Sequence, residues 1–247
     1  MTITAFLKTG EEKTICDDSL LIDNHVLDSD EVIVFSAMQP LCVAVADGVG
    51  GNAGGHDASM FILQHIAKRI SSLADGTQIQ KFLIETNREL IEFASKFADK
   101  ANMATTFTGV FKINNCMYVA HVGNTRLYAL QGNYLKQITV DHTTYQWLTI
   151  HGNYQEADSC NKSEIISCFG GGSADLLKML TVTQPFEEYE PAILVLTSDG
   201  IHDYIDIDSF EEILSDNIPM QDRLEKAWRL AKENGSADDC SIIVMEK

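Results

Sequence analysis

Two apolar runs in this sequence each end in the dipeptide Asp-Gly, and no other feature constrains the fold as strongly. The run LCVAVA leads into Asp47-Gly48, and the run AILVLTS leads into Asp199-Gly200. An uninterrupted apolar run of this length is typical of a strand that is buried on both faces. Each acid therefore stands where a buried strand leaves the core, a position at which proteins commonly carry functional groups.

Further acids precede other apolar strands. Asp17 and Asp18 come before the run SLLI, and Asp238 comes before the run CSIIVM together with Asp239. Such charges, left unpaired at the end of a sheet, would cost several kcal/mol. Lys and Arg are scarce near these segments, and Lys13 is the closest in sequence. Divalent cations are therefore better candidates than Lys or Arg side chains to balance the negative charge of these acids. Ligands that are all oxygen select Mg²⁺ or Mn²⁺ over Zn²⁺.

Simpler interpretations of the same segments remain open. Asp-Gly is a common turn dipeptide, so Asp47-Gly48 could mark an ordinary loop turn. The stretch GVGGNAGG that begins at Gly48 could cradle a phosphate before a helix, although it lacks the Gly-Lys-Ser/Thr ending of a P-loop. The histidines have no ligand-like spacing, which favours core or surface roles for them.

Composition narrows the class of function. The chain carries 18 Lys and Arg against 36 Asp and Glu, a formal net charge of -18 at pH 7, which disfavours nucleic acid and anionic membranes as partners. The six cysteines lie far apart without a C-x-x-C pair, as is typical of reduced thiols. The sequence has neither a signal-peptide pattern nor an apolar window long enough to span a membrane. We therefore expect a cytoplasmic protein.

Hydrophobic periodicity predicts blocks of strands separated by pairs of helices. Strands are expected at residues 2–9, 17–23, 41–47, 105–113, 116–123, 126–131, 134–139, 179–186, 192–198 and 240–247. Helices are expected at residues 56–74, 78–98, 143–152, 208–216 and 220–234. The strands from 105 to 139 are predicted to form one antiparallel meander, and residues 142–175 a flap. This order favours an α+β fold in a single domain, residues 1–247.

Seven segments resemble, in order, the motifs of the metal-dependent protein serine/threonine phosphatases, the PPM or type 2C family, and especially its compact bacterial members. They are GEEKTICDDSLLID, VADGVGGNAGG, MATTFTGV, AHVGNTRLY, DHT, LTSDGIHD and DDCSIIV. The matches extend from about residue 10 to the end of the chain. The resemblance implies a four-layer α-β-β-α sandwich, in which two antiparallel sheets are flanked by helical pairs and carry a small flap.

The resemblance also implies the activity and its residues. A metal-activated water would hydrolyse phosphoserine and phosphothreonine in proteins that a Ser/Thr kinase has phosphorylated, and the enzyme would be a monomer. Asp47, Asp199 and Lys13 would be catalytic, and Lys13 would bind the substrate phosphate. Two Mn²⁺ or Mg²⁺ ions would be held by Asp17, Asp18, Asp47, the carbonyl of Gly48, Asp199 and Asp238.

Three positions depart from the family's pattern. Lys13 replaces an Arg, which keeps the charge but loses the bidentate fork, so substrate binding should be weaker. Asn52 stands where many relatives have a His suggested as proton donor, and a neutral amide cannot act as an acid. Asn124 replaces an Asp, which makes a third metal site doubtful. The alternative is therefore a pseudophosphatase that retains metals and binds phosphoproteins without turnover.

Overall fold

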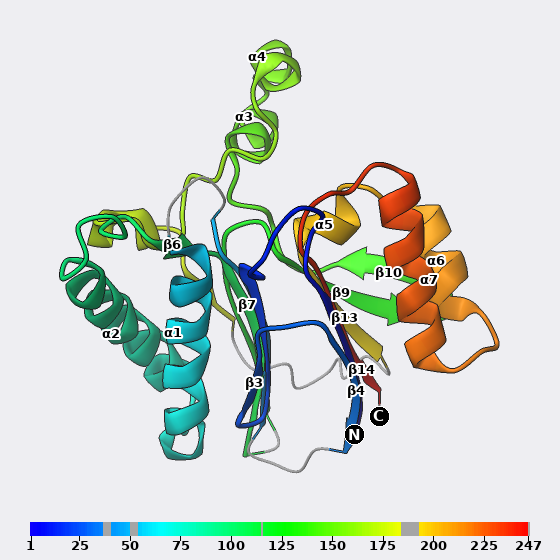
Figure 1. The fold of residues 1–247 in the computed structure, drawn as a ribbon, viewed down its shortest axis with the longest axis horizontal. Coiled ribbons are helices and arrows are strands. Elements are labelled where there is room, and N and C mark those ends of the chain that lie inside the picture. Colours follow the sequence, from blue (N-terminus) through cyan, green and yellow to red (C-terminus); the bar gives the residue numbers. More distant parts are fainter. Residues whose placement is uncertain (37–40, 50–53, 115, 184–192, 247) are drawn as a thin grey trace.

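The computed structural model describes residues 1–36, 41–49, 54–114, 116–183 and 193–246. Two six-stranded antiparallel sheets pack face to face, and helices cover the outer face of each sheet (Figure 1). The predicted four-layer α-β-β-α sandwich is confirmed. Both sheets are antiparallel, as the grouping of strands in the sequence predicts.

The first sheet is covered by the helices α1 and α2. Its strands, in spatial order, are β12 (Thr181–Val182), β8 (Cys116–Val122), β7 (Phe107–Ile113), β5 (Leu41–Asp47), β2 (Asp18–Ile22) and β3 (His25–Leu27). The helices are α1 (Gly55–Arg69), the 3-10 turn η1 (Ile70–Ser72) and α2 (Gly76–Ala94). Ile62, Leu63 and Ile66 of α1 recur at helical spacing, and all three are buried against this sheet.

The second sheet is covered by helices from the C-terminal part of the chain. Its strands, in spatial order, are β10 (Tyr134–Gln137), β9 (Arg126–Gln131), β13 (Ile193–Thr197), β14 (Cys240–Glu246), β1 (Thr2–Lys8) and β4 (Glu31–Ser36). The helices are α5 (Asp199–His202), α6 (Ile207–Ser215) and α7 (Met220–Glu233). Phe210, Ile213 and Leu224 of α6 and α7 are buried in the apolar layer against this sheet.

The remaining elements lie outside the two large sheets. They are α3 (Thr144–Ile150), α4 (Tyr154–Ser159), η2 (Ala174–Leu177) and a small sheet of β6 (Ala104–Thr105) and β11 (Phe169–Gly170). Helices α3 and α4 project from the sandwich at the top of Figure 1. They fall inside the segment predicted as a flap, and that role stays a prediction. Among the described residues, no helix is both long enough and apolar enough to cross a membrane.

The position of strand β5 between two apolar layers explains why its sequence is apolar without interruption. Its residues Leu41, Val43 and Val45 face the core between the two sheets. The residues that alternate with them are buried instead in the layer between this sheet and α1–α2. A strand with an apolar core on each side has no polar face, and its first acid comes where it leaves both cores. The fold therefore delivers Asp47 to the end of the sandwich.

Parts of the secondary-structure prediction are wrong. The segments from 105 to 139 do not form one meander, because β8 and β9 lie in different sheets. The chain changes sheets at Gly123, whose φ of +104° and close approach to Thr106 both require glycine. The strand predicted at 179–186 is limited, among the described residues, to β12 at Thr181–Val182. The strands β3 and β4 and the helices α4 and α5 were not predicted.

Truncation of a side chain in the core between the sheets should be costly. Leu20 is fully buried there, so Leu20→Ala should lower the free energy of unfolding by about 2–5 kcal/mol. Val34 of the edge strand β4 is 49% exposed. Val34→Ala should therefore change the free energy of unfolding by about 0.5 kcal/mol or less. Urea unfolding measures both values. Equal losses would contradict the assignment of this core.

Candidate metal centre

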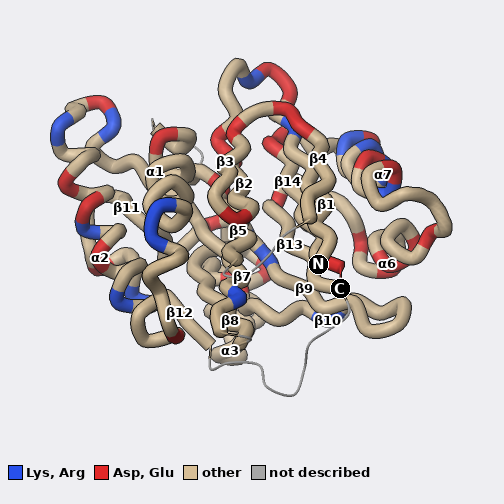
Figure 2. Tube along the Cα trace, turned by 90° about the horizontal axis from the view of Figure 1, so that it is seen from below, with Lys and Arg blue, Asp and Glu red and all other residues tan. Residues whose placement is uncertain are grey.

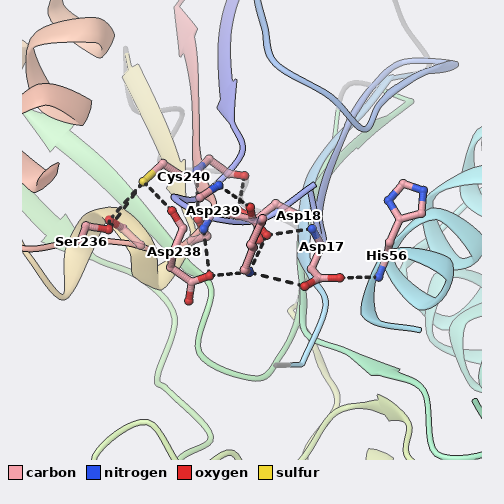
Figure 3. A network of polar contacts seen from close by, with 12 residues as sticks. Asp17, Asp18, His56, Ser236, Asp238, Asp239 and Cys240 are labelled. Carbon is pink, nitrogen blue, oxygen red and sulfur yellow. Dashed lines mark hydrogen bonds and ion pairs between the residues drawn. The ribbon is translucent and has the colours of Figure 1, made fainter. Parts of the chain in front are cut away.

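The acids singled out from the sequence lie at one end of the sandwich. Antiparallel pairing places Asp18 of β2 directly opposite Asp47 of β5 in the first sheet. Asp199 follows β13 and Asp238 precedes β14, and these two strands pair with each other in the second sheet. Figure 3 shows Asp17, Asp18 and Asp238 directed toward a common region. Acids from distant parts of the chain therefore converge, as predicted.

Asp47 lies between acids of both sheets. Its carboxyl group interacts with those of Asp18 and Asp199. Burial raises the pKa of Asp47 well above its ordinary value, and the charges of Asp199, Asp18 and Asp238 raise it further. Two carboxyl groups tolerate such a contact only when one is protonated or when a cation compensates them. Asp47 is therefore the central acid of the cluster.

Asp18 and Asp199 are also short of positive charge. Burial and, next to it, the charge of Asp239 raise the pKa of Asp18 to about 8, although Ser241 donates a hydrogen bond to this carboxyl. Burial and, next to it, the charge of Asp238 raise the pKa of Asp199 to about 6. Each carboxyl group thus holds its proton more tightly than it would in water, because the protein supplies too few cations around it.

Threonines and a glycine fix the backbone around Asp47. The N–H of Thr106 and the hydroxyl of Thr105 both donate to the carbonyl of Asp47, at 2.8 and 2.9 Å. The N–H of Gly48 donates to the carbonyl of Asp17 at 3.1 Å. A Cβ on Gly48 would lie 2.4 Å from the carbonyl carbon of Gly55, so no larger residue fits there. The glycine after Asp47 thus allows the first turn of α1 to approach the acids.

Lys13 lies among the acids. Its Nζ is 2.7 Å from Asp238 Oδ1, 2.8 Å from Asp239 Oδ2 and 3.4 Å from Asp17 Oδ2. The other oxygen of Asp17 accepts a hydrogen bond from the N–H of His56, in the first turn of α1, at 3.0 Å. Burial opposes the charge of Lys13, but its hydrogen bonds to Asp238 and Asp239 prevail and raise its pKa. The predicted phosphate-binding role of Lys13 stays a prediction.

Of the two Asn residues that depart from the family's pattern, the structure describes only Asn124. Asn52 lies outside the described residues. Asn124 is 3% exposed, and its Nδ2 donates to Asp199 Oδ2 at 2.9 Å. Its Oδ1 is buried and has no hydrogen-bond partner among the described residues. Asn124 therefore points one donor at Asp199 and leaves one acceptor oxygen unused beside the acids.

Sequence reasoning did not include Asp239 among the site residues. Asp239 is 2% exposed and contacts Lys13, Gly10 and Asp17 through hydrogen bonds. The signal that could have found it is the doubled acid in DDCSIIV, which places Asp239 beside Asp238 at the start of a buried strand. This second acid brings a further negative charge to Lys13.

The donor set fits hard divalent cations. Within the described ranges, no three His, Cys, Asp or Glu side chains are already arranged as a metal site. The reason is local: Asp47 engages other carboxyl groups, and Lys13 engages Asp238 and Asp17. The side-chain donors that converge here are nevertheless carboxylate and amide oxygens, and their raised pKa values and the unused oxygen of Asn124 show a shortage of positive charge. Mg²⁺ and Mn²⁺ are the ions that such ligands select.

Comparisons with known proteins agree on one family. A family model described as "Protein phosphatase 2C" matches residues 11–240. "Serine/threonine phosphatase stp" of Listeria innocua is 26% identical, with 92% of each chain covered. The crystal structure of serine/threonine phosphatase Stp1 from Staphylococcus aureus superposes with a TM-score of 0.80 at 22% identity, over 99% of this chain and 94% of the other. The serine/threonine phosphatase PstP/Ppp of Mycobacterium tuberculosis gives 0.78 at 23% identity, over 100% and 99%.

The raised pKa of Asp18 predicts how stability depends on pH. Below pH 4 the group is protonated in the folded and unfolded chain, and between about pH 4 and pH 8 only the folded chain keeps the proton. In EDTA the wild type should therefore lose stability relative to Asp18→Asn as the pH rises from 5 to 8. The difference should approach about 1.4 kcal/mol per pH unit, or roughly 3–6 °C in Tm. A constant difference in Tm would show that Asp18 is not perturbed.

Proposed function

The chain belongs to the protein phosphatase 2C family, and on this premise we propose that it is a metal-dependent phosphatase that hydrolyses phosphoserine and phosphothreonine in proteins. The observation that carries the proposal is the convergence of Asp18, Asp47 and Asp199 from both sheets, with pKa values that burial and mutual repulsion raise. The names of the relatives, which are serine/threonine phosphatases, support the substrate class.

The carboxylates of this chain provide ligands for two Mg²⁺ or Mn²⁺ ions. Asp47 would help to hold both ions, because it interacts with Asp18 of one sheet and with Asp199, which follows a strand of the other. We assign Asp238 to the ion at Asp199, and Asp17 and the carbonyl of Gly48 to the other. When bound, the ions supply an activated water and neutralise charge on the phosphate.

Other groups of the chain bind and orient. Asp18 accepts from Ser241 and keeps acceptor capacity with which it can orient a water beside Asp47. Lys13 supplies a cation at the edge of the acids, where its side chain remains partly exposed, and we assign it to the substrate phosphate. The predicted catalytic set of Asp47, Asp199 and Lys13 is thus kept as a proposal. A third metal site at Asn124 is not part of it.

The acidic character of the molecule explains the need for cations at the site. Asp and Glu positions lie along the helices of both outer layers, as Figure 2 shows, and the net charge is -18. A phosphorylated protein would be repelled unless local positive charge compensates at the point of contact. The same charge disfavours nucleic acid as a partner.

The partners and the location are proposed on more general grounds. We propose that the substrates are products of a Ser/Thr kinase and that the chain acts as a monomer, because its own helices cover the outer faces of both sheets. All six cysteines are free thiols, which supports a reducing compartment such as the cytoplasm. The names of the matching family and of the relatives, which are phosphatases, do not favour the pseudophosphatase alternative.

Loss of a proposed metal ligand should abolish turnover without unfolding the protein. With Mn²⁺ and a phosphothreonine peptide, Asp47→Asn and Asp199→Asn should each lower kcat/KM by about a hundredfold or more, since even outer-shell partners of a metal matter by 10- to 100-fold. The Tm of both variants in EDTA should match or exceed that of the wild type, because each loses a carboxyl group that its acidic neighbours repel. Released phosphate measures the rates.

Asp216→Asn is the matched control, because Asp216 pairs with Lys226 on the surface, at 3.1 Å, between α6 and α7. This variant should keep the rate of the wild type. The proposal is wrong if the wild type releases no phosphate with any divalent ion, or if Asp47→Asn keeps full activity.

A further inference from the structure

Asp239 ties the N-terminal part of the site to the start of β14. Its Oδ1 accepts a hydrogen bond from the N–H of Gly10 at 2.7 Å, and its Oδ2 accepts from the N–H of Asp17 at 2.8 Å. The N–H of Glu11 also donates to the carbonyl of Ala237 at 3.0 Å. Asp239 is nearly inaccessible to solvent, so its carboxylate is directed inward, at the segment that carries Lys13.

The contacts of Lys13 use all the donors that it has. A Lys ammonium carries three N–H groups, and the Nζ of Lys13 has three carboxylate neighbours, Asp17, Asp238 and Asp239. In this arrangement no donor remains for a phosphate oxygen. Lys13 can therefore bind phosphate only after it gives up some of these contacts.

The three carboxylates differ in what else they can bind. Asp17 and Asp238 are proposed ligands of the divalent ions, whose binding would draw these oxygens away from Lys13. Asp239 has no such role, and its oxygens are committed to backbone N–H groups and to Lys13. Asp239 is thus the partner that can hold the ammonium in place while its other donors turn to a substrate.

We propose that Asp239 is a positioning residue that anchors the ammonium of Lys13 at the edge of the acid cluster, where Lys13 binds the phosphate of the substrate. The inference rests on the proposed function, because it assigns a partner to the phosphate-binding residue of that same site. It distinguishes Asp239 from its neighbour Asp238: the first orients Lys13, and the second binds metal.

A double-mutant cycle tests the proposal on the full chain saturated with Mn²⁺. The variants are Lys13→Gln, Asp239→Asn and the double variant, with Asp216→Asn as the control for loss of one carboxylate from an ion pair. We expect each single variant to raise KM for a phosphothreonine peptide by about tenfold or more, because a factor of this size corresponds to the loss of one charged hydrogen bond. The double variant should raise KM no further, and the kcat of Asp239→Asn should stay within about threefold of the wild type.

Titration with inorganic phosphate, followed by calorimetry, provides a readout that needs no turnover. The Kd for phosphate should rise by the same factors as KM, whereas the Kd for Mn²⁺ should change little in Asp239→Asn and strongly in Asp238→Asn. Single effects that multiply in the double variant would overturn the proposal, as would an Asp239→Asn protein with the phosphate affinity of the wild type. A wild type that binds phosphate but hydrolyses no peptide would defeat only the proposed function.

A measurement on the wild type covers the case in which Asp239→Asn does not fold. Lys8 is the matched residue, because its side chain is 31% exposed, as is that of Lys13, but it contacts one carboxylate, Asp30. With saturating Mg²⁺, an amine-acetylating reagent should modify Lys13 at least about fivefold more slowly than Lys8, because the hydrogen bond to the nearly inaccessible Asp239 holds the ammonium of Lys13 in place. Equal rates, read by peptide mass spectrometry, would show that Lys13 is not anchored.

Discussion

Repulsion between carboxylates at one end of the sandwich is the constraint on which the rest of the structure depends. Burial and the charges of Asp199 and Asp18 raise the pKa of Asp47 well above its ordinary value, and carboxylates crowded in this way cannot all be ionised without cations. The fold nevertheless keeps them together, through strand pairing in each sheet and through the threonines that hold Asp47. A protein that maintains such a costly arrangement is suited to bind divalent ions, and its single nearby Lys13 does not balance the charge.

The sandwich holds the acids rigidly because its core lies directly beneath them. Strand β5 contributes side chains to the core between the sheets and to the layer under α1, so Asp47 cannot shift without disturbing both. Asp18 is held by β5 on one side and by Ser241 of the second sheet on the other. The acid cluster therefore joins the two sheets, and divalent ions bound there, as proposed, should stabilise the whole fold by removing the repulsion between the acids.

Much of this arrangement could be predicted from the sequence, because the relevant signals are local. Apolar runs that stop at Asp-Gly placed Asp47 and Asp199 at strand ends, and helical spacing placed α1 and α2. The exchange of sheets at Gly123 could not be predicted, since strand partners are set by tertiary packing and not by periodicity. The role of Asp239 was missed for the same reason: its partners Gly10 and Lys13 lie more than 220 residues away in sequence.

An anomalous-scattering map of crystals soaked in Mn²⁺ tests the central claim most directly, because it locates the ions and their ligands together. The account predicts two peaks between the ends of the sheets, both bonded to Asp47, with Asp199 and Asp238 beside one of them. It would be contradicted by a map without peaks at Asp47, or by ions bound only to carboxylates elsewhere on the surface.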